Sequence, residues 1–252
     1  MSDAIAAPAA TAPTAPGAPG APRLVEEARA LAWIHGELAV ARPLPALEAN
    51  AVAHGVALAL REVGPGKLPR VGETTIIGAL AAHSLNAALA AGAFANAQRL
   101  DSEVVSALVL AALMADIGLA RVDFDPLAPD PPTPEQWERM RRHPVEGARV
   151  LMRAGTPFEL PAVVCYEHHL AMDGTGYPEQ AVKRPPHFAS RVVRIADAFT
   201  AMTEARPRRP AHPPDAALAQ METEAGSAFD KDLLAAFVAS IQHLPVVVLP
   251  VE

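Results

Sequence analysis

Two long apolar segments, residues 76–97 and 104–115, most constrain what this chain can fold into. Polar side chains interrupt them: His83, Ser84, Asn86, Asn96 and Ser106. Neither segment therefore resembles the nearly unbroken apolar stretch of a membrane-spanning helix. Hydrophobic residues make up 51% of the 252 residues but aromatic residues only 4%, so the apolar content is mostly Ala, Leu and Val. Because Ala and Leu favour helices, we predict an all-α protein with these segments in its core.

The chain divides by composition into four predicted parts. These are a disordered Ala/Pro-rich tail (1–22), a small N-terminal helical extension (23–70), one helical domain (71–243) and a C-terminal tail (244–252). Helices are expected near residues 24–41, 46–63, 74–98, 102–115, 133–154, 158–169, 189–203, 214–225 and 230–243. Thr133 and Asp230 are expected to cap the helices that follow them. Residues 246–248 are expected to form one short strand, and no pair of strands is visible.

Charge and cysteine content restrict the partners and the compartment. The chain has 21 Lys and Arg against 28 Asp and Glu, a net charge of −7, which argues against a DNA or RNA surface because such surfaces must neutralise phosphates. The single cysteine, Cys165, cannot form an intramolecular disulfide. The N-terminus has Asp3 where a signal peptide would be positive, and prolines break its apolar runs. These features predict a cytoplasmic protein with no membrane contact.

The most distinctive string begins with His168 and His169 at the predicted end of a helix. It continues through Asp173, Gly174 and Gly176 and closes on Tyr177-Pro178. Neutral imidazoles are good ligands for first-row metals, so the paired histidines are candidate ligands. Taken alone, they could equally be two surface histidines before a loop.

The string resembles the signature of HD-GYP proteins, in which His-His-Glu precedes Asp-Gly-x-Gly-Tyr-Pro. The resemblance extends in order through most of residues 83–241. It includes His83-Ser84, Ala115-Asp116-Ile117-Gly118-Leu119, Arg142-His143-Pro144, Arg194-Ile195-Ala196-Asp197, Arg206-Pro207-Arg208-Arg209 and Gly226-Ser227-Ala228-Phe229-Asp230. The resemblance implies an HD-type helical bundle. In that family, His and Asp residues hold iron or manganese, and a metal-bridging hydroxide attacks a phosphodiester of cyclic di-GMP.

The resemblance also assigns residues to the site. The expected metal ligands are His83, Asp116, His143, His168, His169 and Asp197. By family analogy, one metal position uses Asp116, His143, His168 and His169, and the other uses His83, Asp116 and Asp197 with a further histidine. Arg206 and Arg209 are candidate ligands for a phosphate, although two arginines on a solvated turn are the plain alternative.

No catalytic position of the family is intact in this chain. Ala115 stands where the family has the histidine of its His-Asp dyad, so one metal position lacks a nitrogen ligand. Leu119 replaces a lysine expected near the substrate phosphate, and Leu170 replaces a glutamate expected to orient a ligand. We therefore expect one divalent metal site rather than two.

Two functional hypotheses follow from these departures. The favoured one is a degenerate HD-GYP module of cyclic di-GMP signalling. Its candidate ligands are metal, partner proteins such as a diguanylate cyclase, and the dinucleotide itself, and little or no turnover is expected. The alternative is an active phosphodiesterase with an altered metal site. A scaffold that binds neither metal nor nucleotide is a weaker third hypothesis. The loop containing Asp173, Gly174, Gly176, Tyr177 and Pro178 is expected to be a partner contact, unless its glycines serve only a turn that needs positive φ.

Overall fold

The structure is a computed structural model that describes residues 24–72, 78–124, 128, 130–207 and 209–251. The predicted tail, residues 1–22, lies outside them. The elements in order are α1 (Val25–Ala39), α2 (Ala46–Val63), β1 (Leu68–Val71), α3 (Gly78–Ala97), α4 (Ser102–Met114), the 3-10 helix η1 (Ile117–Arg121), α5 (Pro134–Met140), α6 (His143–Ala154), α7 (Glu159–Glu167), α8 (Phe188–Thr203), α9 (Pro214–Glu222), α10 (Lys231–Ile241) and β2 (Val246–Leu249). The predicted all-α class is confirmed, with the addition of two short strands.

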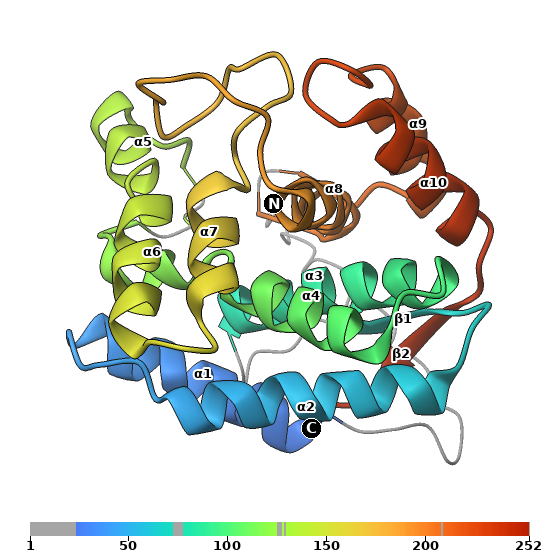
Figure 1. The fold of residues 1–252 in the computed structure, drawn as a ribbon, viewed down its shortest axis with the longest axis horizontal. Coiled ribbons are helices and arrows are strands. Elements are labelled where there is room, and N and C mark those ends of the chain that lie inside the picture. The colour runs from blue at the N-terminus through green and yellow to red at the C-terminus, as the bar shows by residue number, and fades with distance from the viewer. Residues whose placement is uncertain (1–23, 73–77, 125–127, 129, 208, 252) are drawn as a thin grey trace, which may run out of the picture.

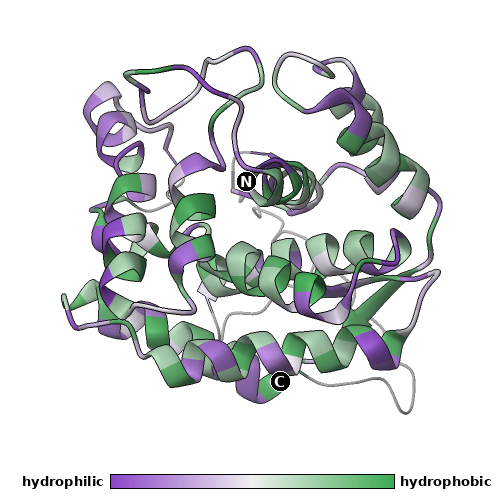
Figure 2. Cartoon of the chain, viewed as in Figure 1, coloured by the Kyte–Doolittle hydropathy of each residue, from purple (hydrophilic) through white to green (hydrophobic). Residues whose placement is uncertain are grey.

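Helices α3 and α4 form the centre of the bundle. Helix α3 packs against α1, α2, α4, α8 and α10. Figure 1 shows α1 and α2 beneath α3 and α4, with α5, α6 and α7 at one end and α9 and α10 at the other. The central helices are also among the most hydrophobic parts of the chain in Figure 2. Two helical stretches, Gly78–Ala97 and Ser102–Arg121, are long and apolar enough to cross a membrane, but 72% and 67% of their most apolar windows are buried. Burial in the core explains their composition.

The predicted helix over residues 133–154 is wrong in one respect, because it is two helices, α5 and α6. The start of α5 is confirmed: Thr133 accepts a hydrogen bond from the Gln136 N–H, and the Gln136 side chain accepts one from the Thr133 N–H. The break follows from Pro144, which has no N–H to bond the Met140 carbonyl and whose ring clashes with a continuing helix. Pro144 therefore lies in the first turn of α6.

The expectation of no strand pair is also wrong. Residues 246–248 do form a strand, as predicted, but β2 pairs in parallel with β1, with Leu68 opposite Val246 and Val71 opposite Leu249. The predicted boundary between residues 70 and 71 falls inside β1. The backbone N–H of Leu24 also donates to the Pro250 carbonyl at 2.9 Å. Thus the C-terminal segment is tied to both ends of the predicted helical extension, and the division into parts stays a prediction.

Candidate metal centre

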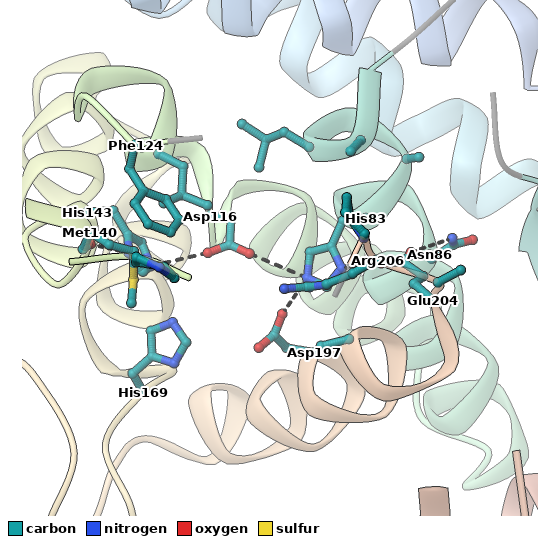
Figure 3. A pocket seen from close by; sticks show the side chains of 18 of the residues that line it. His83, Asn86, Asp116, Phe124, Met140, His143, His169, Asp197, Glu204 and Arg206 are labelled. Carbon is teal, nitrogen blue, oxygen red and sulfur yellow. Dashed lines mark hydrogen bonds and ion pairs between the residues drawn. The ribbon is translucent and has the colours of Figure 1, made fainter. Parts of the chain in front are cut away.

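The six candidate ligands come from five separate places in the chain and meet at one site. They are His83 on α3, Asp116 after α4, His143 at the start of α6, His168 and His169 after α7, and Asp197 on α8. Figure 3 shows Asp116 lying between the His143 side and the His83 side of the cluster. The ligand atoms form two groups, each with all its atoms within 4.8 Å of one another, and Asp116 belongs to both.

The four-residue group contains Asp116, His143, His168 and His169. Asp116 Oδ1 lies 3.1 Å from His143 Nε2 and 3.5 Å from His168 Nε2. The two Nε2 atoms lie 3.4 Å apart. Three imidazoles and one carboxylate converging in this way make a reasonable ligand set for a divalent transition metal.

Helix ends orient two of these histidines. His143 Nδ1 is 2.8 Å from the Met140 carbonyl oxygen, the acceptor that Pro144 leaves without its helical partner. His168 Nδ1 is 2.8 Å from the Cys165 carbonyl oxygen in the last turn of α7, where carbonyl groups have no helical partner. Because a carbonyl only accepts hydrogen bonds, each ring keeps its proton on Nδ1. Each Nε2 then faces Asp116 and would bind a metal that displaces its proton. Metal-binding histidines are usually held in this way through the other ring nitrogen.

The three-residue group contains His83, Asp116 and Asp197. His83 Nε2 lies 2.7 Å from Asp197 Oδ1 and 3.5 Å from Asp116 Oδ2. Since the other oxygen of Asp116 faces His143, Asp116 could offer one oxygen to each ligand group. The three-residue group offers one imidazole, against three in the four-residue group.

The protonation of Asp116 and His169 matches what metal ligands require. Burial alone would raise the pKa of Asp116, but hydrogen bonds with His143 and His168 hold it well below its ordinary value. Burial and the neighbouring His168 and His143 lower the pKa of His169 well below its usual range. The carboxylate is therefore ionised and the exposed edge of the cluster carries a neutral imidazole, as metal binding needs. On donor chemistry, the residues fit a divalent metal.

A close backbone contact sets the separation between Asp116 and His143. A Cβ atom added to Gly118 would lie 2.0 Å from the His143 carbonyl oxygen and 2.6 Å from the Gly147 nitrogen. A Cβ atom at Gly147 would lie 2.4 Å from Cys165 Sγ. Glycine at both positions lets η1 approach α6, and α6 approach α7, at a distance that a side chain would prevent.

With this geometry in view, comparison with known proteins identifies the family. Residues 67–233 match the HD domain family. The chain belongs to this family. It is 31% identical over 149 residues to a cyclic di-GMP phosphodiesterase of Thermotoga maritima, across 58% of this chain and 40% of that protein. It is 33% identical over 136 residues to a 3'3'-cGAMP-specific phosphodiesterase of Vibrio cholerae, across 54% of this chain and 29% of that protein. The chain thus spans less than half the length of these relatives.

A solved structure agrees on the fold. Bd1817, an HDG"Y"P protein of Bdellovibrio bacteriovorus, superimposes with a TM-score of 0.62 at 14% identity, covering 84% of this chain and 67% of that one. Together with the motif from His168 to Pro178, these matches make the chain an HD-GYP member of the HD domain family.

A cavity of about 1000 Å³ opens over the candidate metal centre of this HD-GYP protein. Its walls include five of the six candidate ligands: His83, Asp116, His143, His169 and Asp197. Of the two predicted phosphate ligands, only Arg206 lines it (Figure 3). The Arg209 guanidinium instead donates to the Ala201 carbonyl. The two side chains therefore have different surroundings, although the two backbones are joined by mutual N–H to carbonyl hydrogen bonds of 2.9 Å.

The three substituted positions also differ in their surroundings. Leu119 lines the cavity. Ala115 and Leu170 are buried, with 3% and 5% of their surfaces exposed, and neither is among the described lining residues. Glu167, just before the paired histidines, points away from the ligands: its carboxylate accepts from Arg184, from the His187 N–H and from Ser190 at 2.6–2.8 Å.

The HD-GYP loop packs against the metal centre. The Tyr177 ring stacks on His169 with centroids 4.4 Å apart, and its hydroxyl lies 3.6 Å from Met140 Sδ. Gly174 and Gly176 have φ of 79° and 96°, and a Cβ atom at Gly176 would lie 2.1 Å from the His169 carbonyl oxygen. Asp173 accepts from the Thr175 N–H and hydroxyl, which closes the turn. The glycines thus have a structural role, whatever else the loop contacts.

Sequence reasoning missed Glu204 and Asn86. Glu204 Oε2 lies 2.8 Å from His83 Nδ1, and the Asn86 amide donates to Glu204 Oε1 at 2.7 Å. Both residues line the cavity. Asn86 lies one helical turn after His83 and could have been suspected, but Glu204 is 121 residues from His83 and no local spacing points to it.

Proposed function

We propose that this protein is a degenerate HD-GYP module that binds a divalent transition metal and a cyclic dinucleotide, with little or no phosphodiesterase turnover. The observation that carries the proposal is the inequality of the two ligand groups. One has three imidazoles around an Asp116 oxygen, and the other has a single imidazole. A bound divalent metal would polarise a phosphate oxygen and acidify a coordinated water. Hydrolysis by two metals needs both to be held firmly.

Metal is expected at the four-residue group first, with iron or manganese as the family's usual metals. His143 and His168 are oriented there by backbone carbonyls, and Asp116 is buried and ionised. The His83 group should take up a second metal weakly. Ala115, with no donor atom, supports this difference.

The cavity supports a dinucleotide as the ligand. Its volume of about 1000 Å³ is at the upper end of small-molecule sites. Arg206 supplies a cation on its wall, and Trp137 and Phe124 supply aromatic surface, with ring centroids 6.4 Å apart. Relatives named for cyclic di-GMP and for 3'3'-cGAMP make cyclic dinucleotides the first class to test, with cyclic di-GMP leading. A cytoplasmic location and a signalling partner such as a diguanylate cyclase remain part of the proposal.

The alternative, an active phosphodiesterase with an altered site, is favoured by one observation. His83, Asp116 and Asp197 still converge although the adjacent position is Ala115. The two proposed functions differ in whether the protein hydrolyses the dinucleotide at a useful rate.

The experiment combines metal content with hydrolysis. Purified protein is loaded with Mn²⁺ or Fe²⁺, dialysed and analysed for metal, then assayed with cyclic di-GMP for binding and for linear product. We expect about one retained equivalent, dinucleotide binding and almost no product. His168→Ala should lose the metal, whereas His54→Ala, which changes an exposed histidine of α2, should not. Two firmly held equivalents with steady product formation would establish the active enzyme instead.

A further inference from the structure

The Glu204 carboxylate joins the metal centre to the wall of the cavity. Glu204 directly follows α8, and only 15% of its side chain is exposed. Both of its oxygens are engaged, Oε2 with His83 Nδ1 at 2.8 Å and Oε1 with the Asn86 amide at 2.7 Å. A buried carboxylate with a partner on each oxygen is held in a single position.

His83 lies between acceptors on its two sides. Its Nε2 atom faces Asp197 and Asp116, and its Nδ1 atom faces Glu204. When a metal lies on the Asp116 side, Nε2 must give up its proton to offer a lone pair. The remaining ring proton then sits on Nδ1, where Glu204 accepts it.

The partner of His83 differs in kind from those of the other oriented histidines. His143 and His168 direct Nδ1 to neutral backbone carbonyls, whereas His83 directs it to a carboxylate. A carboxylate acceptor fixes the ring and raises the basicity of the opposite nitrogen more than a carbonyl does. His83, the single imidazole of the three-residue group, therefore has the stronger hydrogen-bond acceptor.

We propose that Glu204 is a positioning residue that fixes the Nδ1–H tautomer of His83 and strengthens its Nε2 as a metal ligand. Glu204 thereby offsets part of the metal affinity that the three-residue group loses because Ala115 has no donor atom. Asn86 extends the arrangement, because it donates to Glu204 and accepts from the Val71 N–H at 2.8 Å. The inference rests on the proposed function only in taking His83 as a ligand.

Glu204→Gln tests the proposal with little change in volume. Zn²⁺ affinity is measured by chelator competition, which resolves a tighter and a weaker site. The variant should weaken the weaker site by roughly 10- to 100-fold and leave the tighter site unchanged. Glu222→Gln on α9, which changes an exposed glutamate, is the matched control and should alter neither site.

A second readout does not depend on metal. In the metal-free protein, ¹H–¹⁵N spectra report the Nδ1–H proton of His83, which faces the Glu204 carboxylate at 2.8 Å. The His83 signal is assigned by its absence from His83→Asn. We expect a far-downfield, slowly exchanging Nδ1–H proton in the native chain, as for a hydrogen bond to a carboxylate, and an upfield, faster-exchanging one in Glu204→Gln. A role of Glu204 in packing alone would leave this signal unchanged.

The outcomes separate the two proposals. Unchanged affinity at the weaker site together with an unchanged Nδ1–H signal would overturn the role of Glu204. Absence of Zn²⁺ binding at every site would overturn the proposed function, while the Nδ1–H signal would still decide for or against Glu204. If Glu204→Gln does not fold, Asn86→Ala removes the other anchor of the carboxylate and should shift both readouts in the same direction.

Discussion

Substituting Gly118 by alanine should disrupt the metal centre without touching a ligand. The new Cβ atom would lie 2.0 Å from the His143 carbonyl oxygen, whereas carbon needs roughly 3.5 Å from a heavy atom. The neighbours are backbone atoms, so η1 and α6 must separate by on the order of 1.5 Å. Overpacking of this kind costs about 3 kcal/mol of unfolding free energy. The same movement would separate Asp116 from His143, whose Oδ1 and Nε2 atoms are now 3.1 Å apart.

The assay measures both consequences. Urea unfolding of the metal-free protein gives the loss of stability, and chelator competition gives the metal affinity, which should fall by on the order of 100-fold. Gly36→Ala on α1 is the matched control, because a Cβ atom there meets nothing within 4 Å. Alanine in that helix should be neutral or stabilise by up to about 1 kcal/mol. A Gly118→Ala protein with native stability and native affinity would show that the contact does not set the ligand geometry.

Three further predictions concern side chains in and around the site. Burial lowers the pKa of His35 to about 4, so between pH 6.5 and 4 the unfolded chain binds more protons and stability falls as pH falls, by roughly 3 kcal/mol. His35→Leu should lose that part of the pH dependence in denaturation curves, and an unchanged slope would contradict the assignment. Leu119→Lys, on the cavity wall, should leave the melting temperature nearly unchanged and tighten cyclic di-GMP binding about 5-fold by calorimetry. Leu170→Glu, at a buried position, should cost about 3 kcal/mol, and equal stability of the two leucine variants would refute the distinction. Glu167→Ala should destabilise by roughly 3 kcal/mol in urea, because three donors lose their acceptor, and a loss under 1 kcal/mol would refute this.

The sequence predicted the helices well because their signals are local. Asp230 caps α10 through the Asp232 and Leu233 N–H groups, as its position indicated. Pro144 indicates a break within residues 133–154, but the prediction treated that range as one helix. The β1–β2 pair joins Leu68 to Val246, and no local pattern can predict a pairing so distant in the chain.

The candidate site followed from motif order rather than from physics alone. The resemblance named the six ligand positions, and the structure brings them together in two groups. The resemblance could not predict that Arg206 lines the cavity whereas Arg209 donates to the Ala201 carbonyl of α8, because this depends on how the turn between them folds. Nor could it find Glu204, whose partner His83 lies on another helix.

The strand pair is linked to the metal centre by an unbroken series of contacts. The Val71 N–H on β1 bonds Asn86, Asn86 bonds Glu204, and Glu204 bonds His83. Strand β1 is held from its other side by β2, near the end of the chain. A protein that binds β2, or tension that peels it from β1, would let Val71 shift and loosen His83 at the far end of the series. On the proposed role of Glu204, a change at the edge of this small sheet would reach His83 without entering the cavity.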